Sequence, residues 1–299
     1  MTNVPETSEH TLKAAGCDFR VRVYPADRPN GAVLVWLHGG AFMFGTIDMP
    51  EADEVACRLS GDGVTVVSVD YTLAPLDALD DFPPPALGDG GPSPDVIAAE
   101  LAAAGPRAPF PTASLQAVAA VSWARQNAAR WGGDPARISI GGASAGGNLA
   151  ASAAVRIRDD GAFNNPASLL LIYPLLHHEI PEPDDELRGL LDALPQHAAM
   201  PPEVGQAIAR GYLGGASPHD IYAFPGGHDM RGMPRTLIVN AEQDALRASG
   251  EAFAADLARS SVDVTVVREP GTQHGYLNVV GHPGAERTFA RMRWVLSSD

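Results

Sequence analysis

The sequence is poor in cysteine and in basic side chains, and both scarcities exclude functions. Its 299 residues contain only two cysteines, Cys17 and Cys57, so a disulfide framework is not expected and a reducing compartment is. Lysine and arginine total 21 against 36 acidic residues, which gives a formal net charge of -15. Nucleic acids and anionic membranes are held chiefly by clustered basic side chains. We therefore expect neither partner.

Long apolar runs are also missing. The longest, LLLIYPLL at 169–176, is too short to span a bilayer and contains a proline, so membrane insertion is not expected. The N-terminal stretch MTNVPETSEH lacks the basic start and apolar core of a signal peptide, which favours the cytoplasm. We leave monomer and homodimer both open.

Nucleotide and metal motifs are absent from the expected places. The chain has no Walker loop, and its first strand–helix turn lacks G-x-G-x-x-G, so no cofactor is expected. The pairs His219-Asp220 and His228-Asp229 lack the ligand spacing of a zinc site. We interpret them as solvated loop residues and expect no metal.

What the sequence does contain is a regular alternation of apolar strands and helical patterns. A half-exposed antiparallel edge strand is expected at 18–24, and the later apolar runs are typical of strands covered on both faces. Those runs are 32–37, 64–69, 137–140, 168–173, 235–240 and 262–267, and helices are expected at 51–60, 113–131, 145–158, 247–260 and 284–296. The pattern predicts an α/β fold with a mainly parallel, doubly wound sheet, in one domain spanning 1–299.

Two segments interrupt the alternation. Residues 76–108 are rich in Pro, Gly and Asp, with a short helix expected at 94–104. Residues 177–232 contain many prolines and two weaker helical stretches, near 184–194 and 202–213. Connections this long inside a compact domain are usually lids or binding loops. We predict that both segments form a lid over the site and line the substrate pocket.

The stretch GASAG at 142–146 follows a strand and opens a helix. It matches the nucleophile elbow G-x-S-x-G, in which a serine occupies a strained turn at the carboxyl end of the sheet. The alternative is a glycine-rich turn with a capping serine. A second motif favours catalysis: strand 32–37 ends in His38-Gly39-Gly40, whose bare amides suit an oxyanion. We expect Gly39, Gly40 and Ala145 to form the oxyanion hole.

A serine nucleophile needs a base, and the base needs an orienting acid. In hydrolases of this architecture the chain order is Ser, then Asp or Glu, then His. Asp244 follows the strand at 235–240 and His274 follows the strand at 262–267, so both belong at the edge of the sheet that carries Ser144. Glu242 is the rival acid and His282 the rival base. His38 is expected to order its own loop.

Together these motifs resemble the hormone-sensitive lipase family of α/β-hydrolases, from about Gly31 to the C-terminus. HGGAF resembles the family's HGGG-type loop, VDYTLAP (69–75) its D-Y-R-L-A-P segment, GASAGGNLA (142–150) its G-D-S-A-G-G elbow and QDALRASG (243–250) its D-x-L-R-D-E-G motif. The resemblance implies a cofactor-free carboxylesterase for small-molecule acyl or aryl esters, with Ser144, Asp244 and His274 as its triad. The alternatives are an amidase or arylformamidase with the same triad, and a ligand receptor on a hydrolase fold.

The chain also departs from the family pattern. Thr72 replaces the usual arginine, Ala143 the usual aspartate of the elbow, and Ala248-Ser249 an acidic pair. The N-terminal part before HGG is short, whereas bacterial members generally carry a long helical cap there. None of the substitutions falls on a triad position, so they bear on the subfamily assignment more than on the reaction. The short N-terminal part, together with the segment inserted between LAP and Pro109-Phe110-Pro111, means that substrate choice cannot be copied from the family.

Overall fold

The structure is a computed structural model, and it describes residues 6–76, 105–161, 164–195 and 202–297. Its centre is an eight-stranded sheet with the strand order β1-β2-β4-β3-β5-β6-β7-β8. The first three strands in this order pair antiparallel, and all later neighbours pair parallel. The strands are β1 (Ser8–Ala14), β2 (Cys17–Tyr24), β3 (Val33–Leu37), β4 (Thr65–Asp70), β5 (Ile138–Ala143), β6 (Leu169–Ile172), β7 (Thr236–Gln243) and β8 (Val264–Gln273).

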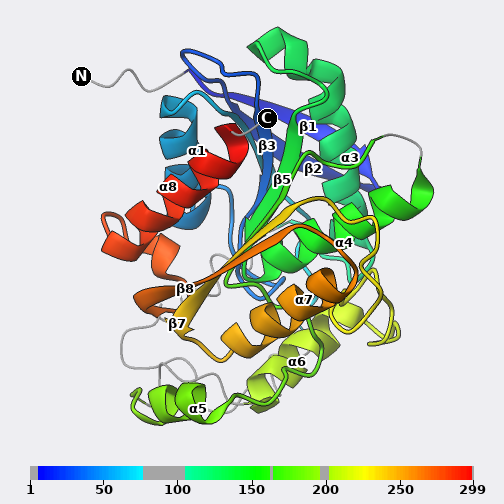
Figure 1. The fold of residues 1–299 in the computed structure, drawn as a ribbon. Helices are drawn as coiled ribbons and strands as arrows, with labels where there is room; N and C mark the ends of the chain where they lie inside the picture. The colour runs from blue at the N-terminus through cyan, green and yellow to red at the C-terminus, as the bar shows by residue number, and fades with distance from the viewer. Residues whose placement is uncertain (1–5, 77–104, 162–163, 196–201, 298–299) are drawn as a thin grey trace.

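Helices cover both faces of this sheet (Figure 1). One face carries α1 (Pro50–Gly61) and α8 (Pro283–Ser297), and the other carries α3 (Thr112–Asn127), α4 (Ala145–Asp160) and α7 (Arg247–Arg259). The short turns η2 (Ala128–Trp131) and η4 (Tyr276–Asn278) follow α3 and precede α8, while α5 (Asp185–Asp192) and α6 (Pro202–Leu213) lie beyond one end of the sheet. The mainly parallel sheet with helices on both faces, expected from the sequence, is confirmed.

Side chains of β3 show why the central strands read as unbroken apolar runs. Val33, Val35 and Leu37 pack into the core beneath α3 and α4, whereas Leu34 and Trp36 pack beneath α1 and α8. All five side chains are fully buried. A strand covered on both faces needs apolar residues at every position, so its hydrophobicity is continuous rather than alternating.

The expected edge strand at 18–24 is not at an edge. It forms β2 and is antiparallel as expected, but β1, which the sequence did not reveal, lies outside it and forms the edge. Most side chains of β1 are exposed, so the segment lacks the apolar alternation by which a half-buried strand is detected.

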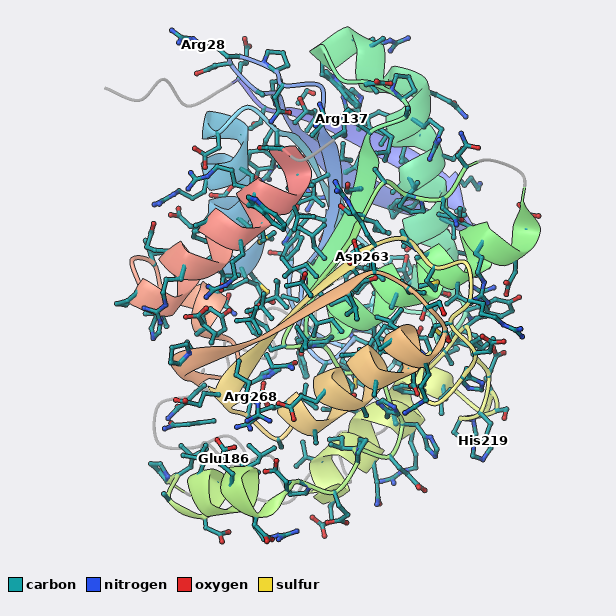
Figure 2. All side chains as sticks on the ribbon, viewed as in Figure 1. Arg28, Arg137, Glu186, His219, Asp263 and Arg268 are labelled. Carbon is teal, nitrogen blue, oxygen red and sulfur yellow. The ribbon has the colours of Figure 1, made fainter. Side chains whose placement is uncertain are left out.

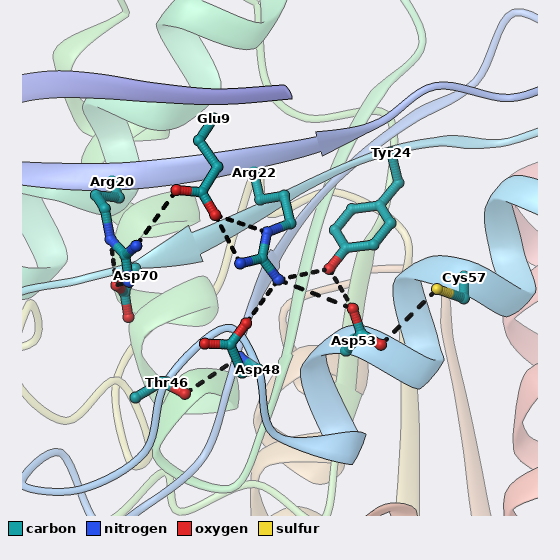
Figure 3. Close-up of polar contacts among 9 residues, drawn as sticks. All are labelled: Glu9, Arg20, Arg22, Tyr24, Thr46, Asp48, Asp53, Cys57 and Asp70. Atoms are coloured by element: carbon teal, nitrogen blue, oxygen red, sulfur yellow. Dashed lines mark hydrogen bonds and ion pairs between the residues drawn. The ribbon is translucent and has the colours of Figure 1, made fainter. Parts of the chain in front are cut away.

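A cluster of charged side chains fixes this N-terminal hairpin to the body (Figure 3). Arg22 on β2 contacts Glu9 on β1 at 2.6 Å and Asp48, in the loop after the HGG turn, at 2.7 Å. The Tyr24 hydroxyl donates to Asp53 on α1 at 2.6 Å and accepts from Arg22 at 3.3 Å. The hairpin is thereby tied to the elements that follow the HGG turn.

The opposite edge also differs from expectation. Residues 262–267 were expected to be covered on both faces, but β8 is an edge strand, bonded within the described chain only to β7, and it continues to Gln273. Most of its side chains are exposed or half-buried, and Val266 is 46% exposed. A run of valines at an open edge has the same composition as a central strand, which explains the error.

The helical expectations hold for the segments that the structure describes, with α3 ending at Asn127 and continuing as η2. The helix expected at 94–104 lies outside the described residues. None of the described helices is both long and apolar enough to cross a membrane.

Candidate active site

Ser144 lies in a sharp turn between β5 and α4, at the carboxyl end of the central strands. Its backbone has φ 53° and ψ -117°, a conformation that a residue with a side chain adopts only at a cost. The Ser144 amide donates to the Ile172 carbonyl at 2.9 Å, and the Ser144 carbonyl accepts from the Asn148 amide at 3.2 Å. These backbone bonds hold the strained residue and aim its hydroxyl out of the turn.

The flanking glycines allow the elbow to pack directly on β3. A Cβ atom at Gly146 would lie 2.2 Å from the Leu37 carbonyl oxygen and 2.4 Å from that of His38. A Cβ at Gly142 would lie 2.3 Å from the Gly146 carbonyl oxygen. Each distance is too short for a side chain, so glycine is required at both positions.

The three residues of the expected triad are in contact. Ser144 Oγ lies 3.0 Å from His274 Nε2, and His274 Nδ1 lies 2.7 Å from Asp244 Oδ2. The register of β7 and β8 brings the last two together, because Gln243 pairs with Gln273 immediately before Asp244 and His274. The three side chains, which were predicted from their order along the chain, therefore form one hydrogen-bonded line.

Burial and hydrogen bonds set the protonation of this line. The Asp244 side chain is 1% exposed, and its second oxygen accepts from the Leu246 amide at 2.9 Å. A carboxylate at Nδ1 favours the His274 tautomer with its proton there, which leaves Nε2 free to accept the serine proton. Packing around the imidazole lowers the pKa of His274 most, but the charge and hydrogen bond of Asp244 and the charge of Glu51 outweigh it, so this pKa is raised above its ordinary value.

The rival residues face elsewhere. His282 Nδ1 accepts from the Gly284 amide at 3.0 Å, and Glu242 accepts from the Gly271 amide at 2.8 Å. His38 is fully buried, contacts the Gly39 carbonyl oxygen through Nδ1 at 2.7 Å and stacks on Tyr71. His38 thus lies inside the HGG turn, as expected.

The structure corrects one expected member of the oxyanion hole. The Gly39 amide donates to the Glu51 Oε1 atom at 2.6 Å, so this donor already has a strong acceptor. The sequence of a glycine-rich turn does not reveal which of its amides will donate to an acidic side chain of the next helix. Gly39 is therefore not a donor to an oxyanion in this arrangement.

The amides that follow Gly39 in the turn are available to donate hydrogen bonds. Gly40 has φ 109° and Ala41 φ 54°, and a Cβ at Gly40 would lie 2.1 Å from the Phe44 carbonyl oxygen. Within the described residues no acceptor is found for the amides of Gly40, Ala41 or Ala145. Ala145 also begins α4, whose N-terminal dipole favours negative charge.

Glu51 and Tyr173 are site residues that the sequence did not point out. Glu51 is 2% exposed, and its Oε2 atom accepts from the Tyr173 hydroxyl at 2.9 Å. Tyr173 is fully buried, and its ring meets the His274 imidazole in a T-shaped contact at a centroid distance of 5.0 Å. The only signal was an acidic residue at a helix start after the HGG turn, which ordinarily indicates a helix-dipole effect.

The 177–232 segment is attached to the body beside the site. Tyr212 of α6 stacks on Phe42 of the HGG loop. Phe224, which follows α6 in the chain, meets both rings edge-on. On α5, Glu186 pairs with Arg268 of β8 at 2.9 Å (Figure 2). Glu186 also pairs with Arg247 of α7 at 3.3 Å. The contacts of the segment with the body thus include an apolar one and an ionic one.

The other expected departures have local roles. Thr72 and Gln116 exchange two hydrogen bonds, at 2.7 and 2.8 Å, and Ser249 accepts from the Leu176 amide at 3.0 Å. Over the described ranges no group of three or more His, Cys, Asp or Glu side chains is placed to hold a metal ion. The ring of His219, one of the expected solvated loop residues, contacts the ring of His178 in a T-shaped arrangement.

Comparison with known proteins yields hydrolases. A family model described as alpha/beta hydrolase fold matches residues 34–81 and 96–278. The carboxylesterase NlhH of Mycobacterium tuberculosis is 31% identical over 268 residues, covering 87% of this chain and 72% of that protein. An arylesterase of Saccharolobus solfataricus is 27% identical over 303 residues, covering 99% of this chain and 84% of that protein.

Solved structures agree with the sequence matches. EstE1, described as a thermophilic and thermostable carboxylesterase cloned from a metagenomic library, is 30% identical with a TM-score of 0.77, covering 98% of this chain and 90% of its own. A hyperthermophilic esterase from Pyrobaculum calidifontis is 27% identical with a TM-score of 0.77, covering 99% and 84% of the two chains.

Proposed function

This chain belongs to the α/β-hydrolase family, in its hormone-sensitive-lipase-like branch, and on that premise we propose that Ser144, His274 and Asp244 hydrolyse carboxylic esters by acyl transfer. The observation that carries the proposal is the line of two hydrogen bonds, 3.0 and 2.7 Å long, from a strained serine to a buried carboxylate. The amidase and receptor alternatives are not favoured, because the relatives are named esterases.

The chemistry follows from the protonation argued above. His274 Nε2 takes the Ser144 proton as Oγ attacks the ester carbonyl, and Asp244 stabilises the imidazolium that forms. The tetrahedral oxyanion accepts hydrogen bonds from the amides of Gly40 and Ala145, with Ala41 as the next donor along the turn. His274 then protonates the leaving alcohol. Water, deprotonated by the same imidazole, releases the acid from the acyl-serine.

We further propose one domain over 1–299, in which the 177–232 segment lines the substrate pocket. Its support is the contact of α6 with Phe42, two residues after Gly40 in the HGG loop. The expected role of residues 76–108 falls mostly outside the described residues. The substrate is a small-molecule ester of small to medium size.

Two finer proposals concern assembly and compartment. The open β8 edge, with Val266 46% exposed, together with Trp294 of α8, 67% exposed, supports a homodimer. Light scattering of Val266→Lys against wild type would test this, since a wild-type monomer contradicts it.

Cys17 and Cys57 are both free thiols, which supports a cytoplasmic location, and fractionation of the source cells would test that location.

Turnover of nitrophenyl acetate and butyrate, alongside a matched anilide, tests the main proposal. Ester turnover should exceed anilide turnover, and Ser144→Ala should lower kcat by about a millionfold, the cost of removing a triad serine. A nitrophenyl-phosphonate label should attach to Ser144 in wild type and be absent from the variant. Wild-type-like turnover by Ser144→Ala would overturn the proposal.

A further inference from the structure

Glu51 is a buried carboxylate directly behind the catalytic groups. It stands in the first turn of α1, and among the described residues no arginine or lysine forms an ion pair with it. Its two oxygens instead accept from the Gly39 amide at 2.6 Å and from the Tyr173 hydroxyl at 2.9 Å. A buried charge without a counter-ion is costly, which calls for an account of its position.

The backbone of Glu51 is fixed independently of its side chain. Its carbonyl accepts from Trp36 Nε1 at 2.8 Å, and its amide donates to Asn278 Oδ1 at 3.2 Å. Trp36 lies in β3 next to the HGG turn, and Asn278 ends η4, the turn that follows His274. The carboxylate therefore projects from an anchored point between the two loops that supply the catalytic groups.

The Glu51 bond sets the position of the HGG turn against the serine. A Cβ at Gly39 would lie 2.5 Å from Glu51 Oε1 and 3.2 Å from Ser144 Cβ, so the glycine backbone is enclosed between the two side chains. The two residues after it, Gly40 and Ala41, have positive φ. With the Gly39 amide held from behind, the following amides cannot swing away from the site without breaking a charge-assisted hydrogen bond.

The second Glu51 oxygen connects to the base. Burial raises the pKa of Tyr173 well above its ordinary value, so the phenol stays protonated and donates to Glu51. The Tyr173 ring packs against the His274 imidazole in a T-shaped contact, with the two planes 62° from parallel. Glu51 also favours the charged imidazole electrostatically, in addition to Asp244, and this contributes to the raised pKa of His274.

We propose that Glu51 is a positioning residue for acyl transfer, which holds the Gly39 turn in place for the oxyanion and, through Tyr173, supports the imidazolium of His274. The proposal rests on the triad proposed above. The sign of the change in kcat distinguishes a geometric role from an electrostatic one, because a negative charge near the oxyanion would by itself slow the reaction. A contribution through geometry predicts that removing the side chain lowers kcat, whereas a purely electrostatic effect on the oxyanion predicts a rise.

Three variants separate these effects. Glu51→Ala removes the acceptor of the Gly39 amide, so kcat should fall by about 10²- to 10³-fold, the range for losing one oxyanion donor, with little change in KM. Glu51→Gln keeps an acceptor oxygen but no charge, so kcat should stay within about tenfold of wild type while the acid limb of the kcat/KM profile moves to lower pH. Tyr173→Phe should lower kcat less than Glu51→Ala does. Glu54→Gln, at a half-buried position on the same helix where the carboxylate pairs with Arg58 at 3.6 Å, is the matched control.

The outcomes distinguish this inference from the proposed function. Wild-type kcat in a folded Glu51→Ala, with Ser144→Ala inactive, would overturn the role of Glu51 and leave the triad intact. Activity in Ser144→Ala would overturn both. Where circular dichroism shows Glu51→Ala to be unfolded, Glu51→Gln decides: an acid limb shifted to lower pH supports the role, and an unshifted limb overturns it.

Discussion

Phe42 lies face to face with Tyr212, with ring centroids 3.9 Å apart and planes 9° from parallel. Phe42 belongs to the loop that carries the HGG turn, and Tyr212 belongs to α6 in the 177–232 segment. Both side chains are almost fully buried, and Phe224 closes the group edge-on. The segment expected to cover the site is thus packed onto the loop expected to hold the oxyanion.

Removing the Tyr212 ring should therefore affect stability and catalysis together. Tyr212→Ala leaves a cavity at a buried aromatic stack, and such changes cost about 3 to 5 kcal/mol. Urea unfolding should show this loss, and kcat should fall because Phe42 loses its support. Tyr212→Phe keeps the stack and serves as the control, with activity near that of wild type. Equal kcat in the folded alanine variant and the control would contradict the link.

The contact of Ser144 and Asp244 with His274 could be predicted, because each of the three residues has a local signature in the sequence. Ser144 is marked by its glycine-flanked elbow, and Asp244 and His274 each follow an apolar strand. Parallel strands end at one edge of a sheet, so strand order alone brings these loops together. The family motifs then agree with the fold that the strand pattern predicts.

Other features have no local signature in the sequence. The edge strand β1 is mostly exposed and reads as a polar segment, and its pairing depends on tertiary contacts such as Arg22 with Glu9. The role of Gly39 depends on Glu51, twelve residues later, turning its carboxylate inward. Sequence patterns report periodicity and local geometry, whereas these partners are set only when α1 packs on the sheet.

The pH dependence should follow from the raised pKa of His274. The reaction needs the neutral imidazole, so activity is lost as pH falls through this pKa. Because the pKa is raised, the acid limb of kcat/KM should lie above the ordinary histidine pKa of about 6.5. His274→Ala should abolish turnover, while His282→Ala should keep both the rate and the limb. Loss of turnover in His282→Ala alone would mean that the base has been assigned wrongly.

The contact between the elbow and β3 makes Gly146 intolerant of any side chain. In Gly146→Ala the new Cβ would lie 2.2 Å from the Leu37 carbonyl oxygen, so the strand or the helix start must move. We expect kcat to fall at least about 100-fold, because displacement of about 1 Å at a catalytic group has this effect. Gly189→Ala, on exposed α5 with nothing within 4 Å of the new atom, is the control and should retain wild-type kcat. Equal rates would show that the elbow is not under this constraint.

The ionic attachment of α5 offers a test of what sets substrate size. Glu186 bonds Arg268 at 2.9 Å and Arg247 at 3.3 Å, and these are contacts between the 177–232 segment and the body. Glu186 is 59% exposed on its side chain, so its loss should cost at most about 1 kcal/mol of stability. Glu186→Gln should nevertheless loosen the position of α5 and change the kcat/KM ratio of long to short acyl esters.

The matched control for that test is on the same helix. Arg188 pairs with Asp185 at 2.6 Å, both on α5, so this exposed pair does not join the helix to the body. Arg188→Gln should leave the acyl-chain ratio unchanged. High salt should move the wild-type ratio toward that of Glu186→Gln, because exposed ion pairs are screened. A ratio that is the same in wild type, Glu186→Gln and Arg188→Gln, at low and high salt, would mean that α5 does not border the acyl pocket.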